Sequence, residues 1–266
     1  MAITYEQPRP QPPPRRETLI ECRDVHKAFG GHTVLGGVNC GIPEGEITVI
    51  MGPSGTGKSV LLRHFVGLLM PDRGDVLVDG ISVPGMGEEE LLALRRNMGM
   101  LFQDGALFSS MSLFDNVAFP LRQHTKKSEP EIREVVMDRL KEVGLAGAEK
   151  KMPNELSGGM RKRAGFARAL VLQPKILLFD EPDSGLDPVR TALLCELIKE
   201  IQRKYENTAI VISHDTKAVF EVADNVILLH QGKVVDAGPK EKIKDSDKDF
   251  TRQFIRGAVE GPLAMD

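Results

Sequence analysis

Short apolar runs and helical segments alternate along most of this chain. A run of apolar and β-branched residues at positions 47–51 ends at Gly52, and apolar side chains then recur at helical spacing over residues 59–69 until Pro71. This pattern predicts a buried strand, a glycine loop and a helix. Upstream, residues 18–45 alternate polar and apolar positions and are interrupted by glycine pairs, so we predict short antiparallel strands there.

The rest of the chain divides into a helical stretch and an alternating stretch. Residues 75–83 have the pattern of a strand and turn, residues 88–96 that of a short helix, and residues 97–102 that of a strand. Between residues 103 and 172 the spacing is mostly helical, notably over residues 129–143 and 158–172, which predicts an inserted helical subdomain.

From residue 175 onward, strands and helices alternate. The pattern predicts strands at residues 176–180, 208–213, 225–230 and 234–237, and helices at residues 188–204 and 216–223. Such alternation is typical of an α/β fold, in which a largely parallel sheet is covered by helices on both faces.

Length and composition fit a folded domain with short extensions. The chain has 266 residues, of which 41% are hydrophobic and 27% charged, and these globular proportions argue against a disordered or coiled-coil chain. We expect a flexible proline-rich tail over residues 1–17, one domain over residues 18–244 and a C-terminal extension over residues 245–266. Recognition by the tail, and regulation or dimer clasping by the extension, are open alternatives to solvated, weakly packed ends.

The charge balance argues against one large class of partner. Thirty-five Lys and Arg against 38 Asp and Glu leave a net charge of −3, so no global positive field favours nucleic acid. No apolar run is long enough to cross a membrane as a helix, so a membrane function would involve another chain. Three scattered cysteines are interpreted as buried small hydrophobic residues in a reducing compartment, namely Cys22, Cys40 and Cys195.

The glycine loop carries a complete phosphate-binding motif. It matches G-x-x-x-x-G-K-[ST] between a predicted strand and helix, with the residues Gly52, Pro53, Ser54, Gly55, Thr56, Gly57, Lys58 and Ser59. Glycines let consecutive backbone N–H groups face inward, and the helix adds the positive end of its dipole, so the loop can hold nucleotide phosphates. Lys58 would supply a positive charge and Ser59 a hydroxyl for Mg²⁺. The alternative, a glycine-rich turn without a ligand, is disfavoured by the complete motif.

Polar residues end two of the predicted strands. Asp180 and Glu181 end the strand expected at residues 176–180, and His214 follows the next strand. Ligands of open α/β sheets bind at the carboxyl ends of strands, so we expect Asp180 to bind Mg²⁺. Glu181 points elsewhere and would act as general base on an attacking water. His214, beside a phosphate site, is expected to sense the γ-phosphate. The alternatives are that the two acids merely end a strand and that His214 is a structural histidine.

A second helix start is suited to an anion. Ser157 can cap the helix predicted from residue 158, and Gly158 and Gly159 leave its first N–H groups accessible. Standing alone, these residues fit an ordinary cap and glycine turn equally well. Four basic residues on this helix are interpreted as a solvated face rather than a nucleic-acid site, namely Arg161, Lys162, Arg163 and Arg168.

Together these motifs resemble the nucleotide-binding subunit of an ATP-binding cassette (ABC) transporter, over nearly the whole chain after residue 19. In chain order the resemblance comprises the phosphate loop, Gln103, the signature segment Leu156-Ser157-Gly158-Gly159-Met160, the Asp180-Glu181 pair, residues 184–187 and His214. It implies a P-loop NTPase core of RecA-like type, with an N-terminal antiparallel β subdomain and a helical subdomain inserted at about residues 103–172. Residues 18–244 would then be the ATPase domain.

The resemblance implies an ATP- and Mg²⁺-dependent homodimer. Two ATPase domains are expected to close head to tail, with Ser157, Gly158 and Gly159 of one domain facing the γ-phosphate bound by the other. Asp187 is expected to bridge across the dimer.

Further roles are also implied by the resemblance. Gln103 would join the metal or the attacking water and relay to the membrane partner. Phe29, which precedes Lys58 by 29 residues, would stack on adenine. A single aromatic residue is more often packing, so only its position favours stacking for Phe29.

Within the family, a narrower resemblance is visible. Residues 102–108 and 114–121, the Ser-Gly-Gly-Met form and residues 253–262 are similar to the ATPases of Mla and Mce phospholipid transport systems. Met160 stands where many relatives have glutamine, and Asp183 where threonine is frequent. Neither touches the phosphate chemistry, so ATP hydrolysis is still expected.

The resemblance implies partners in a membrane. These are integral-membrane permease subunits and lipid-binding accessory subunits, with the ATPase peripheral on the cytoplasmic face of the inner membrane. Four residues are expected to form an exposed groove for a cytoplasmic helix of the permease, namely Leu107, Phe108, Met111 and Phe114. Packing of the same residues inside the helical subdomain is an equal alternative.

Two other functions stay open. One is a soluble cassette ATPase acting on nucleic acid or ribosomes, but the chain has a single cassette and lacks a long coiled coil, zinc-type cysteines and a basic stripe. The other is transport of an ion or small polar solute. A copurified permease with bound lipid would distinguish these functions.

Overall fold

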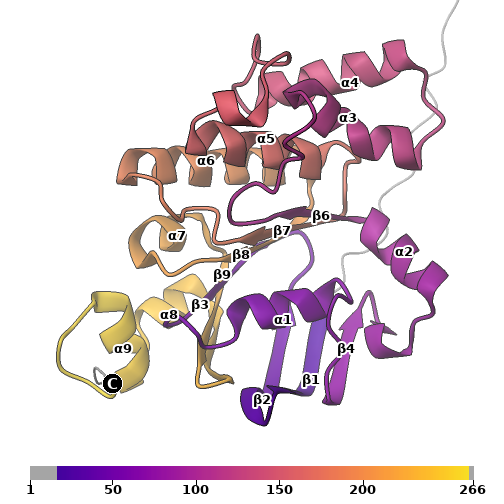
Figure 1. Cartoon of the computed structure of the whole chain (residues 1–266). Coiled ribbons are helices and arrows are strands. Elements are labelled where there is room, and N and C mark those ends of the chain that lie inside the picture. Colours follow the sequence, from indigo (N-terminus) through magenta and orange to yellow (C-terminus); the bar gives the residue numbers. More distant parts are fainter. Residues whose placement is uncertain (1–16, 264–266) are drawn as a thin grey trace, which may run out of the picture.

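Two β-sheets form the frame of the molecule, and helices cover the larger one (Figure 1). The computed structural model describes residues 17–263, apart from the side chains of residues 217–219. All but the last residue of the predicted proline-rich tail lies outside this range. No helix in the described part of the chain is long and apolar enough to span a membrane.

The smaller sheet is antiparallel and comes from the N-terminal part of the chain, as predicted. Its strand order is β2-β1-β4-β5. The strands are β1 (Ile20–Phe29), β2 (His32–Ile42), β4 (Arg73–Val78) and β5 (Ile81–Ser82). Gly30 and Gly31, both with positive φ, make the turn between β1 and β2.

The larger sheet has the order β10-β9-β3-β8-β7-β6 and is parallel except for the pair β9 and β10. Its strands are β3 (Ile47–Met51), β6 (Met98–Leu101), β7 (Ile176–Asp180), β8 (Thr208–Ile212), β9 (Asn225–His230) and β10 (Lys233–Pro239). Ile212 of β8 is the register partner of both Ile50 and Asp180. The carboxyl ends of β3, β8 and β7 therefore meet at one edge of the sheet.

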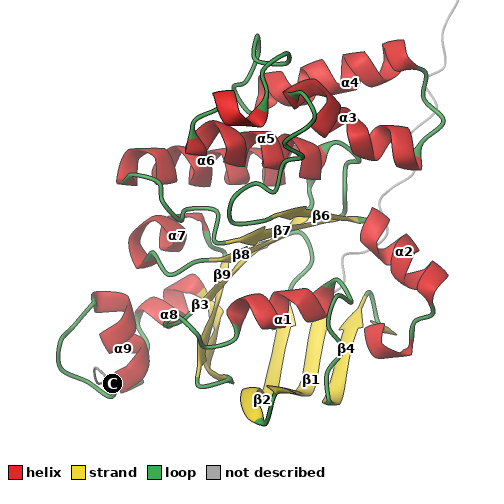
Figure 2. Ribbon diagram, in the orientation of Figure 1, coloured by secondary structure: helices red, strands yellow, loops and turns green. Residues whose placement is uncertain are grey.

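Helices cover both faces of the larger sheet (Figure 2). The helix α1 (Lys58–Phe65) packs between the two sheets, and the helical insertion lies over the opposite face. The other helices are α2 (Glu88–Arg96), α3 (Leu113–His124), α4 (Glu129–Glu142), α5 (Gly158–Leu170), α6 (Pro188–Tyr205), α7 (Thr216–Val222), α8 (Lys240–Lys244) and α9 (Asp249–Arg256), with short 3₁₀ turns at Val83–Gly85 and Pro153–Glu155.

The larger sheet separates two hydrophobic cores, because successive side chains of a strand point to opposite faces. On β7, Leu177 and Phe179 belong to the core beneath the helical insertion, whereas Ile176 and Leu178 belong to the core around α1. Phe166 of α5 meets Phe179 edge-on, with ring centroids 5.0 Å apart. The helix α5 is thereby fixed directly on the strand β7.

One helix is shorter than predicted. The apolar spacing predicts a helix as far as residue 69, but α1 ends at Phe65. Gly67 has φ 64°, its N–H donates to His64 O, and the N–H of Leu68 donates to Arg63 O. This pair of bonds is a Schellman motif, which a left-handed glycine makes possible.

The basic residues of α5 form the predicted solvated face only in part: Arg161 is exposed, whereas Lys162 is buried and Arg163 and Arg168 are half-buried. Their side chains donate to backbone carbonyl oxygens of nearby loops: Arg161 to Leu156, Lys162 to Pro182 and Ser184, Arg163 to Val143 and Gly144, and Arg168 to Gly105 and Ala106. Carbonyl groups at loops and helix ends lack helical partners, and these long side chains satisfy them.

The C-terminal extension packs more closely than a solvated end. Thr251 and Gln253 of α9 are buried. The buried carboxylate of Asp236 on β10 accepts hydrogen bonds from Ser246 Oγ at 2.6 Å, Thr251 Oγ1 at 2.9 Å and Lys248 Nζ at 3.0 Å. A buried carboxylate at the sheet edge therefore anchors this segment.

The three cysteines are free. Cys22 and Cys195 are buried as predicted, whereas Cys40 is only half-buried. Burial raises the pKa of the Cys195 thiol to about 12. A raised pKa disfavours the reactive thiolate at neutral pH, in line with a packing role.

Candidate nucleotide-binding site

The loop after β3 curls around the side chain of its own lysine. Lys58 Nζ donates to Gly52 O at 2.8 Å and to Pro53 O at 2.9 Å, and Thr56 Oγ1 also donates to Pro53 O at 2.9 Å. A Cβ atom at Gly52, where φ is 149°, would lie 2.0 Å from the carbonyl oxygen of Leu229, so only glycine fits there. An ammonium group has three N–H bonds, and Lys58 uses two of them to hold the loop.

Burial and two nearby carboxylates have opposite effects on the pKa of Lys58. The side chain is buried, which lowers its pKa, while the charges of Glu181 and Asp180 act in the opposite direction. A nearby negative charge favours the protonated lysine, and phosphate oxygens would add to that effect. The site is therefore electrostatically suited to a polyphosphate.

Ser59 and Asp180 supply a pair of oxygen donors beside the loop. Ser59 Oγ donates to Asp180 Oδ1 at 2.7 Å, and Asp180 is 9% exposed. Hydroxyl and carboxylate oxygens suit Mg²⁺, which usually binds one or two protein groups together with substrate phosphates and water. The described residues contain no group of three or more His, Cys, Asp or Glu side chains that could hold a metal. The donors present thus fit an ion that binds together with a nucleotide.

Glu181 turns away from Asp180 immediately after the strand. Its φ of 49° lies in the left-handed region, and its N–H donates to Ile212 O at 3.1 Å. Its Oε1 lies 4.0 Å from His214 Nδ1. The Glu181 side chain is 24% exposed and that of His214 51% exposed, so water can reach both. The two acids diverge as predicted, and the strand ends bring Glu181 and His214 together.

Gln103 contacts the loop that follows β7. It is exposed, and its Nε2 donates to Ser184 Oγ at 3.1 Å. This bond links the loop after β6 to the loop after β7. Gln103 therefore lies against Ser184, three residues beyond Glu181, and its role toward the metal or the attacking water stays a prediction.

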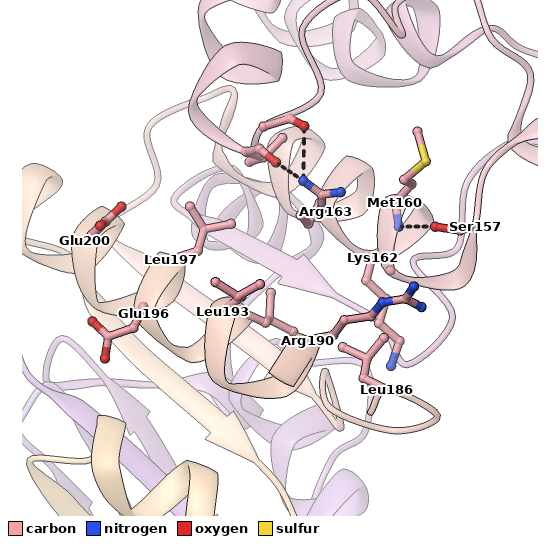
Figure 3. Close-up of a pocket in the computed structure, with 14 residues that line it drawn as sticks. Ser157, Met160, Lys162, Arg163, Leu186, Arg190, Leu193, Glu196, Leu197 and Glu200 are labelled. Atoms are coloured by element: carbon pink, nitrogen blue, oxygen red, sulfur yellow. Dashed lines mark hydrogen bonds between the residues drawn. The ribbon is translucent and has the colours of Figure 1, made fainter. Parts of the chain in front are cut away.

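Ser157 caps α5 as predicted. Its Oγ accepts a hydrogen bond from Met160 N at 3.3 Å, and the helix begins at Gly158 (Figure 3). A cavity of 570 Å³ lies between α5 and α6, lined by Ser157 and Gly159 among others. None of residues 52–59 lines this cavity. The signature segment and the phosphate loop of one chain do not share this cavity.

Asp187 and Phe29 are both accessible, as their predicted roles require. Asp187 caps α6 by accepting from Arg190 N at 3.0 Å, and its side chain is 50% exposed. Phe29 is 46% exposed at the end of β1, with Lys27 Nζ 5.5 Å from its ring centroid. The structure brings neither residue to the phosphate loop through a hydrogen bond or ion pair.

Sequence reasoning missed a set of polar residues behind the site. Lys162 donates to the backbone around Asp183, and Asp183 Oδ2 accepts from Ser213 Oγ at 2.7 Å. A usable signal existed for Lys162, which precedes the buried Phe166 by four residues and so shares its helix face. No comparable sequence signal marked Ser213.

A family model described as "ABC transporter" matches residues 35–184, which is more than half of the chain. The matched part includes the phosphate loop, Gln103, the signature segment and the Asp180-Glu181 pair. The chain belongs to the ABC transporter family. It is thus an ATP-binding subunit of an ABC transporter and an ATPase.

Two relatives align with almost all of this ABC ATPase. The chain is 51% identical over 246 residues to the "Probable ribonucleotide transport ATP-binding protein mkl" of Mycobacterium leprae, covering 92% of this chain and 71% of that protein. It is 43% identical over 245 residues to the "Intermembrane phospholipid transport system ATP-binding protein MlaF" of Escherichia coli (strain K12), covering 92% of this chain and 91% of that protein.

Solved structures confirm the predicted α/β P-loop fold. CbiO1 from Clostridium perfringens, part of the ABC transporter complex cbiONQ, superposes with a TM-score of 0.80 at 32% identity, covering 91% of this chain and 96% of that one. The cassette MJ0796, in a dimeric post-hydrolysis state bound to ADP and Pi, gives a TM-score of 0.77 at 31% identity, covering 83% and 98%.

Proposed function

We propose that this ABC ATPase energises phospholipid transport through a separate membrane permease. The observation that carries the proposal is the similarity to MlaF, which extends over 92% of this chain and 91% of that protein. MlaF is named as part of an intermembrane phospholipid transport system. On this proposal the ATPase binds peripherally at the cytoplasmic face of the inner membrane, and lipid-binding accessory subunits deliver or receive the lipid.

The proposed working form is a head-to-tail homodimer. In one chain, the cavity beside the signature segment includes none of the phosphate-loop residues. Pairing two chains head to tail would place the Ser157 cap of one against the γ-phosphate held by Lys58 of the other. The relative MJ0796, solved as a dimer with ADP and Pi, supports this arrangement.

Hydrolysis in the proposed mechanism uses groups at three strand ends. The loop at residues 52–59 and Lys58 would bind the β- and γ-phosphates, with Ser59 and Asp180 as ligands of Mg²⁺. Bound Mg²⁺ supplies positive charge that stabilises the phosphates. The Glu181 carboxylate would accept a proton from the water that attacks the γ-phosphorus in line, and His214 would hold the γ-phosphate oxygens. Release of ADP and phosphate would reopen the dimer.

A groove between α2, β6 and α3 is the proposed permease contact. It has a volume of 520 Å³, and its lining includes Leu92, Phe102, Phe108 and Phe119. The rings of Phe108 and Phe119 lie 5.0 Å apart, and Phe108 is 42% exposed. An apolar groove of this kind fits a short amphipathic helix.

Only one of the four residues predicted for this groove lines it. Phe108 does, whereas Leu107 and Phe114 pack against the core of the helical insertion, and Met111 is half-buried away from the groove. The partial burial of Leu107 and Phe114 supports the alternative weighed for them, packing inside the subdomain. Phe102 and Phe119 were not predicted for the groove.

Ribonucleotide transport is a second candidate function. It is favoured by the 51% identity to the mkl protein, whose name states that solute. In both cases the ATPase would drive a permease that carries the solute. The two candidates therefore predict different molecules bound to the purified complex.

Purification of the chain together with its permease tests the proposal. We expect the complex to retain phospholipid, identified by mass spectrometry, and added phospholipid to raise its ATPase rate. A complex without lipid whose ATPase rate responds to ribonucleotides other than ATP would favour the second candidate instead.

A variant of the groove tests the permease contact. Phe108→Asp should release the permease while leaving ATP binding by the chain unchanged. Glu200→Gln, at an exposed position of α6, is a control that should retain the permease.

A further inference from the structure

Lys162 lies buried behind the loop that follows β7. It is 5% exposed, and its Nζ donates to Pro182 O at 2.8 Å and to Ser184 O. A buried ammonium is costly unless hydrogen-bonded, and here both bonds go to backbone carbonyls on either side of Asp183. One side chain of α5 thereby fixes two peptide groups of the carboxylate loop, which we define as residues 181–184.

Asp183 fixes the same loop from its other side. It is 7% exposed, and its Oδ2 accepts from Ser213 Oγ at 2.7 Å. Its Oδ1 is buried without a hydrogen-bond partner among the described residues. Ser213 Oγ in turn accepts from Asp215 N at 3.0 Å, so the segment after β8 is tied to the carboxylate loop.

The charges of Lys162 and Asp183 compensate each other within this buried region. Burial lowers the pKa of Lys162, and the Asp183 carboxylate is the first of the charges that oppose this change. No hydrogen bond joins the two side chains directly. The pairing is therefore one of charge across the loop rather than of contact.

The carboxylate loop connects the residues proposed to face the γ-phosphate. It begins with Glu181, its Ser184 Oγ accepts from Gln103 Nε2 at 3.1 Å, and His214 directly follows Ser213. Lys162 lies on the helix that Ser157 caps, and Figure 3 shows its side chain directed toward the loop that carries Leu186. The signature segment and the carboxylate loop are thus mechanically joined through Lys162.

We propose that Lys162 and Asp183 are positioning residues for ATP hydrolysis. Lys162 holds the carboxylate loop against α5, and Asp183 holds it against the end of β8. Together they set the position of Glu181 relative to Gln103 and His214. The proposal rests on the proposed role of Glu181 as general base.

Substitution of Lys162 with methionine, which keeps its length without its donors, is the first test. We expect kcat to fall about tenfold or more, because a misplacement of about 1 Å can cost about 10²-fold, while the Kd for a fluorescent ATP analogue changes less than about twofold. Lys162→Arg keeps the charge and the N–H donors on a larger, planar group, so its kcat should exceed that of Lys162→Met without reaching that of wild type.

Arg163→Met is the matched control for Lys162→Met. Arg163 is the next residue on α5 and also donates to two carbonyls, those of Val143 at 3.0 Å and Gly144 at 3.1 Å, but neither belongs to the carboxylate loop. We expect a loss of thermal stability without a tenfold loss of kcat. A Lys162→Met enzyme within twofold of wild type, or an equal kcat loss in Arg163→Met, would overturn the proposal.

Asp183→Asn provides a test if Lys162→Met does not fold. Asparagine can still accept from Ser213 but removes the charge facing Lys162, so we expect kcat to fall severalfold with ATP affinity unchanged. Wild-type kcat in a folded Asp183→Asn protein would overturn the role of Asp183.

Glu181→Gln separates the general-base role of Glu181 from the positioning role of Lys162 and Asp183. If it stays active, the general-base role fails, whereas an inactive Glu181→Gln beside a fully active Lys162→Met refutes only the positioning role.

Discussion

Ser59 Oγ donates a 2.7 Å hydrogen bond to Asp180 Oδ1 across 121 residues of sequence. The contact exists because β3 and β7 both pair with β8, so the helix after β3 begins beside the carboxyl end of β7. A hydroxyl and a carboxylate from distant parts of the chain thus meet next to the phosphate loop, where Mg²⁺ would bind between them and a nucleotide.

Removal of either oxygen donor should raise the Mg²⁺ requirement of ATP hydrolysis. We expect Asp180→Asn to shift the Mg²⁺ concentration for half-maximal rate upward more than Ser59→Ala does, because a carboxylate contributes charge as well as an oxygen ligand. Titration of the ATPase rate with MgCl₂ measures the shift. Asp138→Asn, on the exposed surface of α4, should leave the curve in place. An unshifted curve for Asp180→Asn would contradict the metal assignment.

Glu181→Gln should separate ATP binding from turnover. An amide cannot accept the proton of the attacking water, so we expect kcat to fall by about 10²- to 10⁴-fold. ATP affinity should stay near that of wild type, because Lys58 and the loop at residues 52–59 are unchanged. Single-turnover hydrolysis and equilibrium nucleotide binding measure the two quantities. Turnover at the wild-type rate would remove Glu181 from the mechanism.

Phe29→Ala tests adenine stacking. The ring is 46% exposed, so its loss should change the thermal midpoint little. Base stacking on an aromatic ring contributes about 1–3 kcal/mol, so the Kd for ATP should rise by roughly 5- to 150-fold. Inorganic triphosphate, which lacks a base, should bind the variant and the wild type equally. Unchanged ATP affinity in the variant would assign Phe29 to packing.

Much of the fold could be predicted because its strands are short apolar runs bounded by glycine or acidic residues. The strands at Ile47–Met51, Ile176–Asp180 and Asn225–His230 occupy the predicted positions. The end of α1 could not be predicted from apolar spacing, because the Schellman bonds around Gly67 stop the helix while apolar residues continue. Backbone hydrogen bonds of this kind produce no periodic pattern of apolar residues in the sequence.

The site was predictable where a motif fixes local geometry and less so where tertiary contacts decide. The Ser157 cap follows from helix geometry, and the apolar run of β7 places Asp180 at the end of the strand. The bond from Gln103 to Ser184 joins loops 81 residues apart, which no local pattern encodes. Lys162, Arg163 and Arg168 of α5 were misassigned because charge alone predicts solvation, whereas loop carbonyls in the fold needed donors.

The anchor of the C-terminal segment should depend on pH. Burial alone would raise the pKa of Asp236, but hydrogen bonds from Ser246, Lys248 and Thr251 outweigh it and lower the pKa below the ordinary 3.8. The folded state then binds fewer protons than the unfolded state near this pH, so the stabilisation is complete above pH 3.8 and is lost as pH falls through the folded pKa.

Asp236→Asn should therefore lower the thermal midpoint at pH 6, and the gap from wild type should narrow below pH 3.8. Thermal unfolding of both proteins between about pH 3 and pH 6 measures this gap. Asp247→Asn, at an exposed position of the same segment, should match wild type throughout. A gap that stays constant with pH would contradict the account of Asp236.

The composite site of the head-to-tail dimer is tested most directly by mixing two inactive variants. Lys58→Met removes the phosphate-loop charge and Gly158→Asp places a carboxylate in the signature segment, so each homodimer should be inactive. A mixed dimer contains one intact site, made by the loop of one chain and the signature segment of the other. If the sites act independently, an equal mixture should recover about a quarter of the wild-type ATPase rate. A mixture no more active than its two components would contradict the shared site.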